Sequence, residues 1–487
     1  MQKDLNTNIN SIKTALGESN ELITKEITCG KTKCAILYIL GLTDTISLSK
    51  FVIDPLLAWK DNITPTIASN QILTLGETQL ECEEDKIINL LLKGKGVLLI
   101  DNTDSALILA VDKFQERAIS EPPTSAVLKG PRAGFTENLK TNLAILRKIL
   151  ATPNLRTTST EVGKHTKTTV TIVYIDKVAD NNVVDNVKKR ISSIDIDGII
   201  DSYYIASYLE ERPNSMFKQI GNSEKPDVVA GKLLEGRVAI IVDGSPLILT
   251  VPFVYIEELQ SGDDYYSSPS RASFVRVIRI ISILITILTP AMYIAIVLHH
   301  HKAIPLKFLI TIVNTTKGLP LTPFAEILFV LLLFEILYEA SLRMPKYLGL
   351  ALSIVGALIL GDTAVKAGLI SPPAVMIIAI SGLSIYCIPD QAPQLYTLRV
   401  LFTLSGAFLG FFGITAMVVF FLVYLSDFDT YGTPYLAPIA PFIRKDMKDS
   451  LYKIDITRAK TRPSSISNNK NNLTRQGRQK NGKNNFK

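Results

Sequence analysis

The chain has 487 residues, of which 47% are hydrophobic and 20% charged, and its formal net charge is +7. The positive charge is local: thirteen Lys or Arg accompany three Asp between Arg444 and Lys487, which leaves the rest of the chain at −3. The four cysteines and four histidines suggest no disulfide framework or zinc site and leave few candidates for a histidine-dependent nucleophile, so we expect no metal or cofactor.

Two α/β subdomains are expected in the first half of the chain, at residues 29–152 and 153–268. They follow a polar leader, residues 1–28, which lacks the apolar core of a signal peptide, so the soluble part is expected to stay cytoplasmic. In both subdomains short apolar runs alternate with amphipathic segments, as in strands that alternate with helices. Strands are predicted at 34–40, 96–101, 106–111, 168–174, 237–243 and 247–251, and helices at 85–93, 138–150 and 178–191.

A transmembrane helical domain is expected over residues 269–430. Ile280–Leu298 and Val400–Leu425 contain nineteen and twenty-six residues without Asp, Glu, Lys, Arg or His. About twenty apolar residues suffice to cross a bilayer as a helix. Spans are predicted near 274–298, 321–341, 347–365, 373–388 and 400–425. The apolar segment 305–316 is too short to cross and is expected to form an interfacial or re-entrant helix.

Charges at the ends of this block predict its orientation. Arg271, Arg276 and Arg279 flank the first span and favour a cytoplasmic N-terminal region. Residues 431–487 form a basic tail, disordered from about 456, whose natural partners are anionic lipid headgroups rather than nucleic acid. A cytoplasmic tail requires an even number of crossings, whereas five spans are predicted, so the number stays open between four and six.

Ionisable residues within the apolar block are candidates for function. Glu326, Glu335 and Glu339 lie in the second predicted span, and an acid at a helix centre costs roughly 2.5–3.5 kcal/mol on insertion. Glu335, Glu339 and Arg343 are spaced by four residues and can pair on one helix face. A polar conduit or switch and a glutamate–arginine clasp both fit Glu326 and Glu335, and the clasp is favoured for Glu339.

Two other polar clusters have simpler interpretations. His299, His300 and His301 follow the first span, where a solvated interfacial cluster is favoured over a metal site. Asp195, Asp197 and Asp201 alternate with apolar residues, which is more typical of a solvated face than of a metal site. Glycines such as Gly406 and Gly410 are expected to permit close helix packing.

Many short motifs follow one another in order over about residues 30 to 445. They are Glu121–Pro123, Gly130–Phe135 with Asn142 and Arg147–Lys148, Glu224–Asp227, Leu234–Val238, Val242–Pro246, Asp264–Tyr266, Gly318–Glu326, Phe334–Glu335, Tyr338–Ala340, Arg343–Pro345 and Gly368–Pro372. Together these motifs resemble one family, the A subunits of spore germinant receptors. The sequence departs from the family pattern at Ser125, Lys129, Ala133 and Lys225.

The resemblance implies a non-enzymatic membrane protein that acts with a permease-like B subunit and a lipoprotein C subunit. It implies an integral protein of the spore inner membrane and a homo-oligomer that forms a nutrient-gated ion conduit. It further suggests domain contacts at Gly130, Pro131, Arg132, Gly134, Lys225, Asp227, Glu235 and Arg237, and an intramembrane polar path at Glu326, Glu335, Glu339 and Arg343.

Two alternatives remain beside the receptor. A paralogue that works with the dipicolinate-release channel shares the fold and motifs, and its gene neighbours would distinguish it from a receptor subunit. A substrate-carrying transporter, from another functional class, predicts inverted repeats in the membrane block. The sequence shows no such repeats.

Overall fold

A computed structural model of the chain describes residues 1–17, 19–112, 129–343, 363–455 and 461–466. The chain divides into two compact units. The first comprises Met1–Val254, Asp429–Thr433 and the described residues after 455, and the second comprises Tyr255–Phe428 and Pro434–Asp455. The motif Glu121–Pro123 and most of the span predicted at 347–365 lie outside the described residues.

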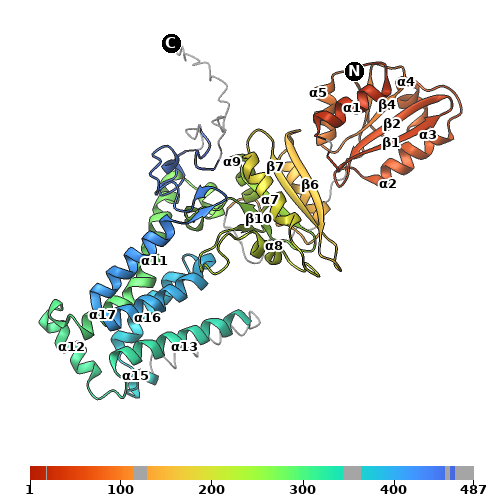
Figure 1. The fold of residues 1–487 in the computed structure, drawn as a ribbon. Coiled ribbons are helices and arrows are strands. Elements are labelled where there is room, and N and C mark those ends of the chain that lie inside the picture. Colours follow the sequence, from red (N-terminus) through yellow and green to blue (C-terminus); the bar gives the residue numbers. More distant parts are fainter. Residues whose placement is uncertain (18, 113–128, 344–362, 456–460, 467–487) are drawn as a thin grey trace, which may run out of the picture. The chain divides into compact units, whose positions relative to one another are not determined.

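The first unit begins with a five-stranded antiparallel sheet of order β1-β2-β4-β5-β3 (Figure 1). Its strands are β1 (Leu22–Cys29), β2 (Thr32–Ile39), β3 (Thr78–Glu81), β4 (Gly96–Ile100) and β5 (Ala106–Leu109). Its helices are α1 (Leu5–Ala15), α2 (Thr45–Leu48), α3 (Asp54–Ala58), α4 (Pro65–Ile67) and α5 (Glu84–Leu92), with π-helical turns at Ser49–Ile53 and Ala68–Ile72. Helices α1 and α5 pack on one face, and the segment from α2 to α4 packs on the other.

A second five-stranded antiparallel sheet in the same unit repeats this strand order, as β6-β7-β9-β10-β8. Its strands are β6 (Leu155–Val162), β7 (Thr168–Ile175), β8 (Gly221–Ser223), β9 (Val238–Val242) and β10 (Ile248–Val251). Helices α7 (Asn181–Ser192) and α8 (Ser202–Leu209) cover one face, and α6 (Leu139–Ile149) and α9 (Pro226–Glu235) cover the other. Each sheet therefore starts with a hairpin of two eight-residue strands, β1–β2 or β6–β7. The last two strands of each sheet in chain order, β4–β5 or β9–β10, lie between that hairpin and the remaining edge strand, β3 or β8.

The structure confirms the predicted strands and helices to within a few residues. Helix α6, expected within the first subdomain at 29–152, instead covers the second sheet, because its leucines pack against β7, β9 and β10. The segment expected as a polar leader is different, since it forms α1 and most of β1. Helix α1 buries Leu5, Ile9 and Ile12 against the first sheet, and Asp4 caps it by accepting a hydrogen bond from the Thr7 backbone N–H. Because polar residues interrupt the apolar ones in this amphipathic helix and in the edge strand β1, neither contains a continuous apolar run that would indicate it in the sequence.

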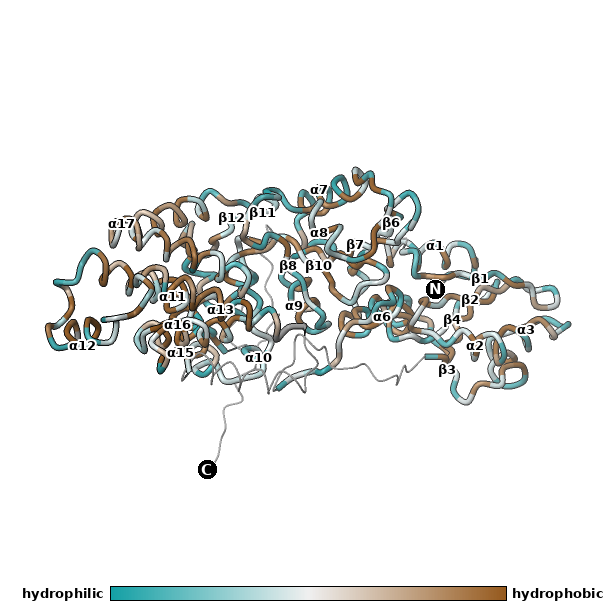
Figure 2. Tube along the Cα trace, turned by 90° about the horizontal axis from the view of Figure 1, so that it is seen from below, coloured by the Kyte–Doolittle hydropathy of each residue, from teal (hydrophilic) through white to brown (hydrophobic). Residues whose placement is uncertain are grey.

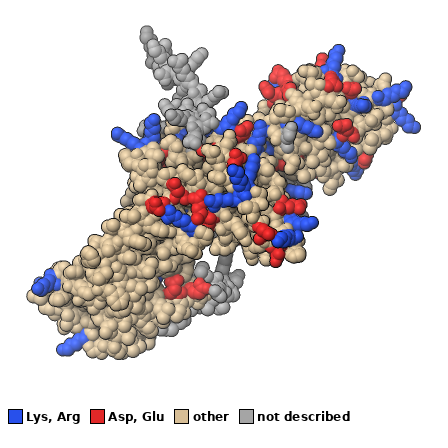
Figure 3. All heavy atoms as spheres, in the orientation of Figure 1, with Lys and Arg blue, Asp and Glu red and all other residues tan. Residues whose placement is uncertain are grey.

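The second unit is helical. Its main elements are α10 (Gly262–Tyr265), α11 (Pro269–Leu298), α12 (Leu306–Thr316), α13 (Pro323–Arg343), α15 (Ala364–Lys366), α16 (Pro372–Ile385) and α17 (Ala392–Ser426), with 3₁₀ turns at Tyr255–Leu259, His301–Ala303 (η4) and Pro389–Gln391. Within the part of the chain that the structure describes, two helices are long and apolar enough to cross a membrane, Pro269–Leu298 and Pro389–Ser426. Brown, hydrophobic residues dominate α11 and α16 in Figure 2, and Figure 3 shows a broad uncharged surface over this unit.

Helix α17 is a hairpin of two arms rather than one continuous helix. Gly410 has a φ of 60° and a ψ of −144°, which lie outside the helical region. The rings of Phe402 and Phe421 stack with centroids 5.9 Å apart, although nineteen positions along a straight helix would separate them by about 28 Å. The expectation of a single span over 400–425 is therefore wrong, because the chain reverses direction at Gly410.

The first arm of α17 runs parallel to α11. A Cβ atom on Gly406 would lie 2.7 Å from the carbonyl oxygen of Ala291, and one on Gly410 would lie 3.1 Å from Cβ of His299. Successive positions of the arm thus meet successive positions of α11 in the same direction. Gly406 permits close helix packing as expected, whereas Gly410 also forms the hinge.

Candidate functional site

A buried arginine in α17 pairs with a glutamate in α13. The side chain of Arg399 is only 2% exposed, and its Nη2 lies 3.7 Å from Oε2 of Glu335. Its guanidinium group also lies over the ring of Tyr396, 4.9 Å from the centroid, and donates a hydrogen bond to Oγ of Ser381 at 3.4 Å. The ion pair and these contacts offset the cost of removing the guanidinium from water.

The polar contacts continue from Arg399 into α16 and α11. Ser381 Oγ donates to the carbonyl oxygen of Thr286 at 2.8 Å, and Thr286 Oγ1 donates back to the carbonyl oxygen of Ser381 at 3.3 Å. Both side chains are fully buried. A chain of polar contacts therefore links α13, α17, α16 and α11 through the apolar interior of the unit.

Glu326, at the start of α13, is a buried acid of this unit. Its side chain is 1% exposed, and Oε1 accepts a hydrogen bond from the backbone N–H of Ser371, the N-cap of α16. The positive end of the α16 dipole favours a carboxylate at this position. Among the described residues, Oε2 of Glu326 and the hydroxyl of Tyr293 have no hydrogen-bond partner.

The two remaining residues of the expected polar path, Glu339 and Arg343, lie further along α13. Glu339 is exposed, and Arg343 ends α13 with a side chain outside the described part of the structure. Glu335 pairs across helices with Arg399, and the pairing expected from the spacing of four stays a prediction. Sequence reasoning missed Arg399, which directly precedes the span predicted at 400–425. An arginine at the border of a long apolar run is the sequence signal that could have found it.

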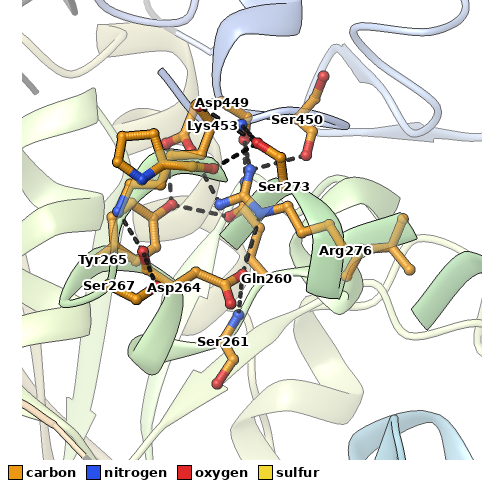
Figure 4. A network of polar contacts seen from close by, with 12 residues as sticks. Gln260, Ser261, Asp264, Tyr265, Ser267, Ser273, Arg276, Asp449, Ser450 and Lys453 are labelled. Atoms are coloured by element: carbon orange, nitrogen blue, oxygen red, sulfur yellow. Dashed lines mark hydrogen bonds and ion pairs between the residues drawn. The ribbon is translucent and has the colours of Figure 1, made fainter. Parts of the chain in front are cut away.

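Charged residues also cluster where α11 begins (Figure 4). Arg276 is fully buried, and its guanidinium group contacts Oδ2 of Asp264 and Oδ1 of Asp449, both at 3.1 Å. The same group donates to the backbone carbonyl oxygens of Asp449 and Ser450 at 2.8 and 2.9 Å. Arg276 thus holds together α10 and the chain that follows α17.

Two further cations complete this network. Arg279 contacts both carboxylate oxygens of Asp264 at 2.8 and 3.1 Å. The Lys453 ammonium donates to the backbone carbonyl oxygen of Asp264, and burial lowers the pKa of Lys453. The network contains three cationic side chains but only two carboxylates, those of Asp264 and Asp449. The cations therefore also contact backbone carbonyl oxygens and the ring of Tyr265, whose centroid lies 4.7 Å from the Lys453 Nζ. The arginines used to predict orientation are therefore partly structural.

The motif Val242–Pro246 joins two helices of the second subdomain. Oδ1 of Asp243 accepts a hydrogen bond from the Leu139 backbone N–H, 3.1 Å away, at the start of α6. Oγ of Ser245 donates to Oδ1 of Asp201 at 2.6 Å, and Oδ2 of Asp201 accepts from the Tyr203 backbone N–H at 3.0 Å. Asp201 is therefore the N-cap of α8, neither a metal ligand nor a merely solvated acid.

The expected domain-contact residues lie around α9. Lys225, which is 2% exposed, lies 3.8 Å from Asp227 at the start of this helix, and the Arg237 Nη2 lies 3.3 Å from Glu235 at its end. Gly236, with a φ of 107°, ends the helix in the left-handed conformation that favours glycine.

The Gly130–Phe135 loop reaches the same helix start. The Phe135 backbone N–H donates to the carbonyl oxygen of Glu224 at 2.8 Å, which brings this loop to the N-terminal end of α9. Gly134 is buried, whereas Gly130, Pro131 and Arg132 are exposed. The two ion pairs at the ends of α9 are separated by the helix length, about 15 Å.

Comparisons with known proteins agree with the motifs. Spore germination protein KA of Bacillus subtilis (strain 168) is 36% identical over 480 residues, which cover 97% of this chain and 88% of that relative. Spore germination protein GerLA of Bacillus cereus is 31% identical and covers 93% of each chain. The crystal structure of the N-terminal domain of the A subunit of the Bacillus megaterium spore germinant receptor GerK3 is 29% identical, with a TM-score of 0.40 over 52% of this chain and 97% of that one.

The sequence model of one family covers nearly the whole chain, from residue 10 to residue 465. It spans both sheets of the first unit and the helical unit with its buried charges. The protein belongs to the Bacillus/Clostridium GerA spore germination protein family.

Proposed function

We propose that this protein is the membrane subunit of a nutrient germinant receptor and helps to trigger spore germination without acting as an enzyme. The family match over residues 10–465 carries this proposal. The protein works in the spore inner membrane with a permease-like B subunit and a lipoprotein C subunit. The curated relatives named above are spore germination proteins, which supports the process, and the partners follow from the resemblance of the motifs.

The helical unit spans the membrane several times, with the first unit and the tail on the cytoplasmic side. The hairpin in α17 supports this orientation. Its two arms replace one of the five expected spans, so the number of spans becomes six, which is even. At 1.5 Å per residue the arms on either side of Gly410 are about 27 and 24 Å long, close to the roughly 30 Å of a hydrocarbon core. The segment after α17 also returns to Arg276 near the start of α11.

The buried polar contacts of the helical unit form part of an ion path, which a homo-oligomer completes. A charge inside a membrane is costly, and such residues usually mark ion or proton pathways. Glu335, Arg399 and Ser381 supply the central section of this path. Glu326 lies at the opposite end of α13, and Glu339 and Arg343 extend the path beyond Glu335. The residues at the two ends of α9, with the Gly130–Gly134 loop, contribute domain contacts that transmit the nutrient signal.

The test is deletion of the gene followed by nutrient challenge of the spores. Loss of the response to at least one nutrient, restored by the wild-type gene, is expected of a receptor subunit. A normal response to every nutrient, in a strain without redundant receptors, contradicts the proposal. Slow dipicolinate release with normal early ion release would favour the paralogue that works with the dipicolinate-release channel.

The ion path is tested separately. Glu335→Gln removes the charge that faces Arg399 and should slow ion release after nutrient addition at least severalfold, at an unchanged protein level. Glu339→Gln, one turn along the same helix, serves as the comparison, because this side chain is exposed and its loss should have a smaller effect. Unchanged ion release in Glu335→Gln spores removes this glutamate from the mechanism and leaves the receptor assignment intact.

A further inference from the structure

The hinge at Gly410 separates two backbone groups that would bond to each other in a continuous helix. In an α-helix the N–H of residue 411 donates to the carbonyl oxygen of residue 407. The non-helical Gly410 prevents this bond. Backbone groups left in this way need other partners, because an unpaired N–H or C=O away from water costs free energy.

Two consecutive histidines at the end of α11 form hydrogen bonds with these two backbone groups, the Ala407 carbonyl and the Phe411 N–H. Nε2 of His299 lies 2.7 Å from the carbonyl oxygen of Ala407. The Phe411 N–H donates to Nε2 of His300 at 3.5 Å. The ring of His300 also stacks on the ring of Phe411, with centroids 4.8 Å apart and an interplanar angle of 21°. The histidine pair therefore replaces the helical hydrogen bond that the hinge removes.

These contacts assign different protonation states to the two rings. A carbonyl oxygen only accepts, so His299 carries a proton on Nε2 and donates it to Ala407. A backbone N–H only donates, so Nε2 of His300 is unprotonated and its ring is neutral, with the proton on Nδ1. A protonated His300 would carry hydrogens on both nitrogens and could not accept from Phe411.

We propose that the His299–His300 pair is a proton-sensitive clasp that holds the α17 hairpin closed. When His300 is neutral, it accepts from Phe411 and the arms stay folded against each other. When His300 gains a proton, this contact is lost and the Phe411 N–H becomes available to bond Ala407 again, which favours a straighter α17. The loss of one hydrogen bond of this kind changes the ratio of the two forms between about two- and tenfold.

The charged groups around the histidine pair come from four neighbouring elements. Both histidines are exposed, so protons reach them from the medium. Among Asp, Glu, Lys, Arg and His, the neighbouring elements carry His301 and Lys302 on η4, Lys307 on α12, Lys366 on α15, and Glu326, Glu335, Glu339 and Arg343 on α13; neither α16 nor the part of α17 between Arg399 and Asp427 carries any of these residue types. The Glu326 carboxylate accepts a hydrogen bond from the Ser371 backbone N–H. The proposal does not depend on the proposed function, since it concerns the chain alone.

The experiment measures the distance between the two arms in the full-length protein in lipid nanodiscs. Spin labels are placed at Val400→Cys and Val423→Cys, which are 39% and 64% exposed, after the exposed Cys82 and Cys387 are changed to Ser. In the hairpin these positions lie close together, whereas a straight helix would separate their backbones by about 35 Å. Pulsed electron resonance at pH 8 should give the short distance, and at pH 5 the population of the long distance should rise two- to tenfold.

Matched variants show which ring is responsible. His300→Gln keeps an acceptor that does not titrate, so the short distance should persist at both pH values. His300→Phe keeps a stacking ring without an acceptor and should populate the long distance already at pH 8, while His301→Gln should respond like the parent. A distance that does not change between pH 8 and pH 5 in the parent overturns the proposal, as does a pH response that survives in His300→Gln. Hydrogen–deuterium exchange of residues 405–413 in the unlabelled chain, corrected for intrinsic rates, gives an independent reading.

Discussion

Arg276 and Asp449 are 173 positions apart, yet one guanidinium group contacts both the carboxylate and the backbone carbonyl of the aspartate. The distances are 3.1 Å to Oδ1 and 2.8 Å to the carbonyl oxygen. Because Arg276 lies near the start of α11 and Asp449 follows α17, these two parts of the helical unit are held at the same end of the unit. Polar contacts of this type fix where the chain leaves the helical unit, which hydrophobic packing alone does not specify.

Replacement of Arg276 should release the segment after α17. Arg276→Gln leaves Asp264 buried without one of its cations, and breaking a buried pair costs about 3–5 kcal/mol. Hydrogen–deuterium exchange over residues 447–455 should become much faster in this variant. Arg271→Gln is the control, because Arg271 is exposed on the same helix. Equal protection of the segment in both variants would show that the ion pairs do not hold it.

Gly406 should tolerate no side chain, since a Cβ atom there would lie 2.7 Å from the Ala291 carbonyl oxygen. Gly406→Ala should force α11 and the first arm of α17 apart and cost about 1–3 kcal/mol, more than alanine regains as a better helix former. The measurement is the thermal unfolding midpoint of the protein in detergent. Gly382→Ala, where the nearest atom is 3.9 Å away, is the matched control and should leave the midpoint nearly unchanged. Equal midpoints for the two variants contradict the close approach.

The sequence predicts the helices and strands that have a clear apolar run or an apolar periodicity. The central strands β2, β4, β7 and β9 are continuous apolar runs and were found. The edge strands β1 and β6 were not, because Leu22–Cys29 and Leu155–Val162 alternate with polar residues on a solvent-facing side. The repeated strand order of the two sheets could not be read either, since strand pairing depends on contacts that are distant in sequence.

The candidate site shows the same limit more clearly. Spacing by four predicts a pairing of Glu335 along its own helix, but it gives no sign of Arg399, 64 positions away in another helix, whose guanidinium group contacts Glu335. Likewise, a run of twenty-six apolar residues predicts one span, and only the backbone of Gly410 reveals that the chain turns back. Composition predicts that a segment is apolar; it does not determine which glycine adopts a conformation outside the helix.

The second subdomain should lose stability at acidic pH through Asp201. Burial alone would raise the pKa of Asp201, but hydrogen bonds from Ser245 and from the backbone N–H of Tyr203 hold its pKa below the ordinary value. A depressed pKa contributes stability that is complete above the unfolded-state pKa, near 4, and is lost as the pH falls through the folded-state pKa.

Hydrogen–deuterium exchange of α8 in the full-length protein between pH 5 and pH 3, corrected for intrinsic rates, measures this loss. Ser245→Ala removes one of the bonds that lower the pKa and should reduce the dependence on pH, whereas Ser193→Ala, on an exposed side chain at the end of α7, should not. A parent protein whose α8 is equally protected throughout this range contradicts the role of Asp201.

Tyr431 should stabilise the second subdomain although it follows the last helix of the chain. Its ring belongs to the core formed by α7, α8 and the sheet, its hydroxyl donates to the carbonyl oxygen of Leu209 at 3.0 Å, and the Arg190 guanidinium lies 5.1 Å from its ring centroid. Tyr431→Phe should cost about 1 kcal/mol through the lost hydrogen bond, and Tyr431→Ala about 3–5 kcal/mol through the cavity.

Burial also raises the pKa of the Tyr431 phenol. A raised pKa contributes stability that is present below the unfolded-state pKa, near 10, and is lost as the pH rises towards the folded-state value. Limited proteolysis of the subdomain at pH 8 and pH 10.5 should therefore show a smaller loss of resistance in Tyr431→Phe than in the parent. Tyr452→Phe, at a side chain 46% exposed, should behave like the parent. If Tyr431→Ala leaves resistance at pH 8 unchanged, the ring does not contribute to this core, and the chain after α17 is not anchored there.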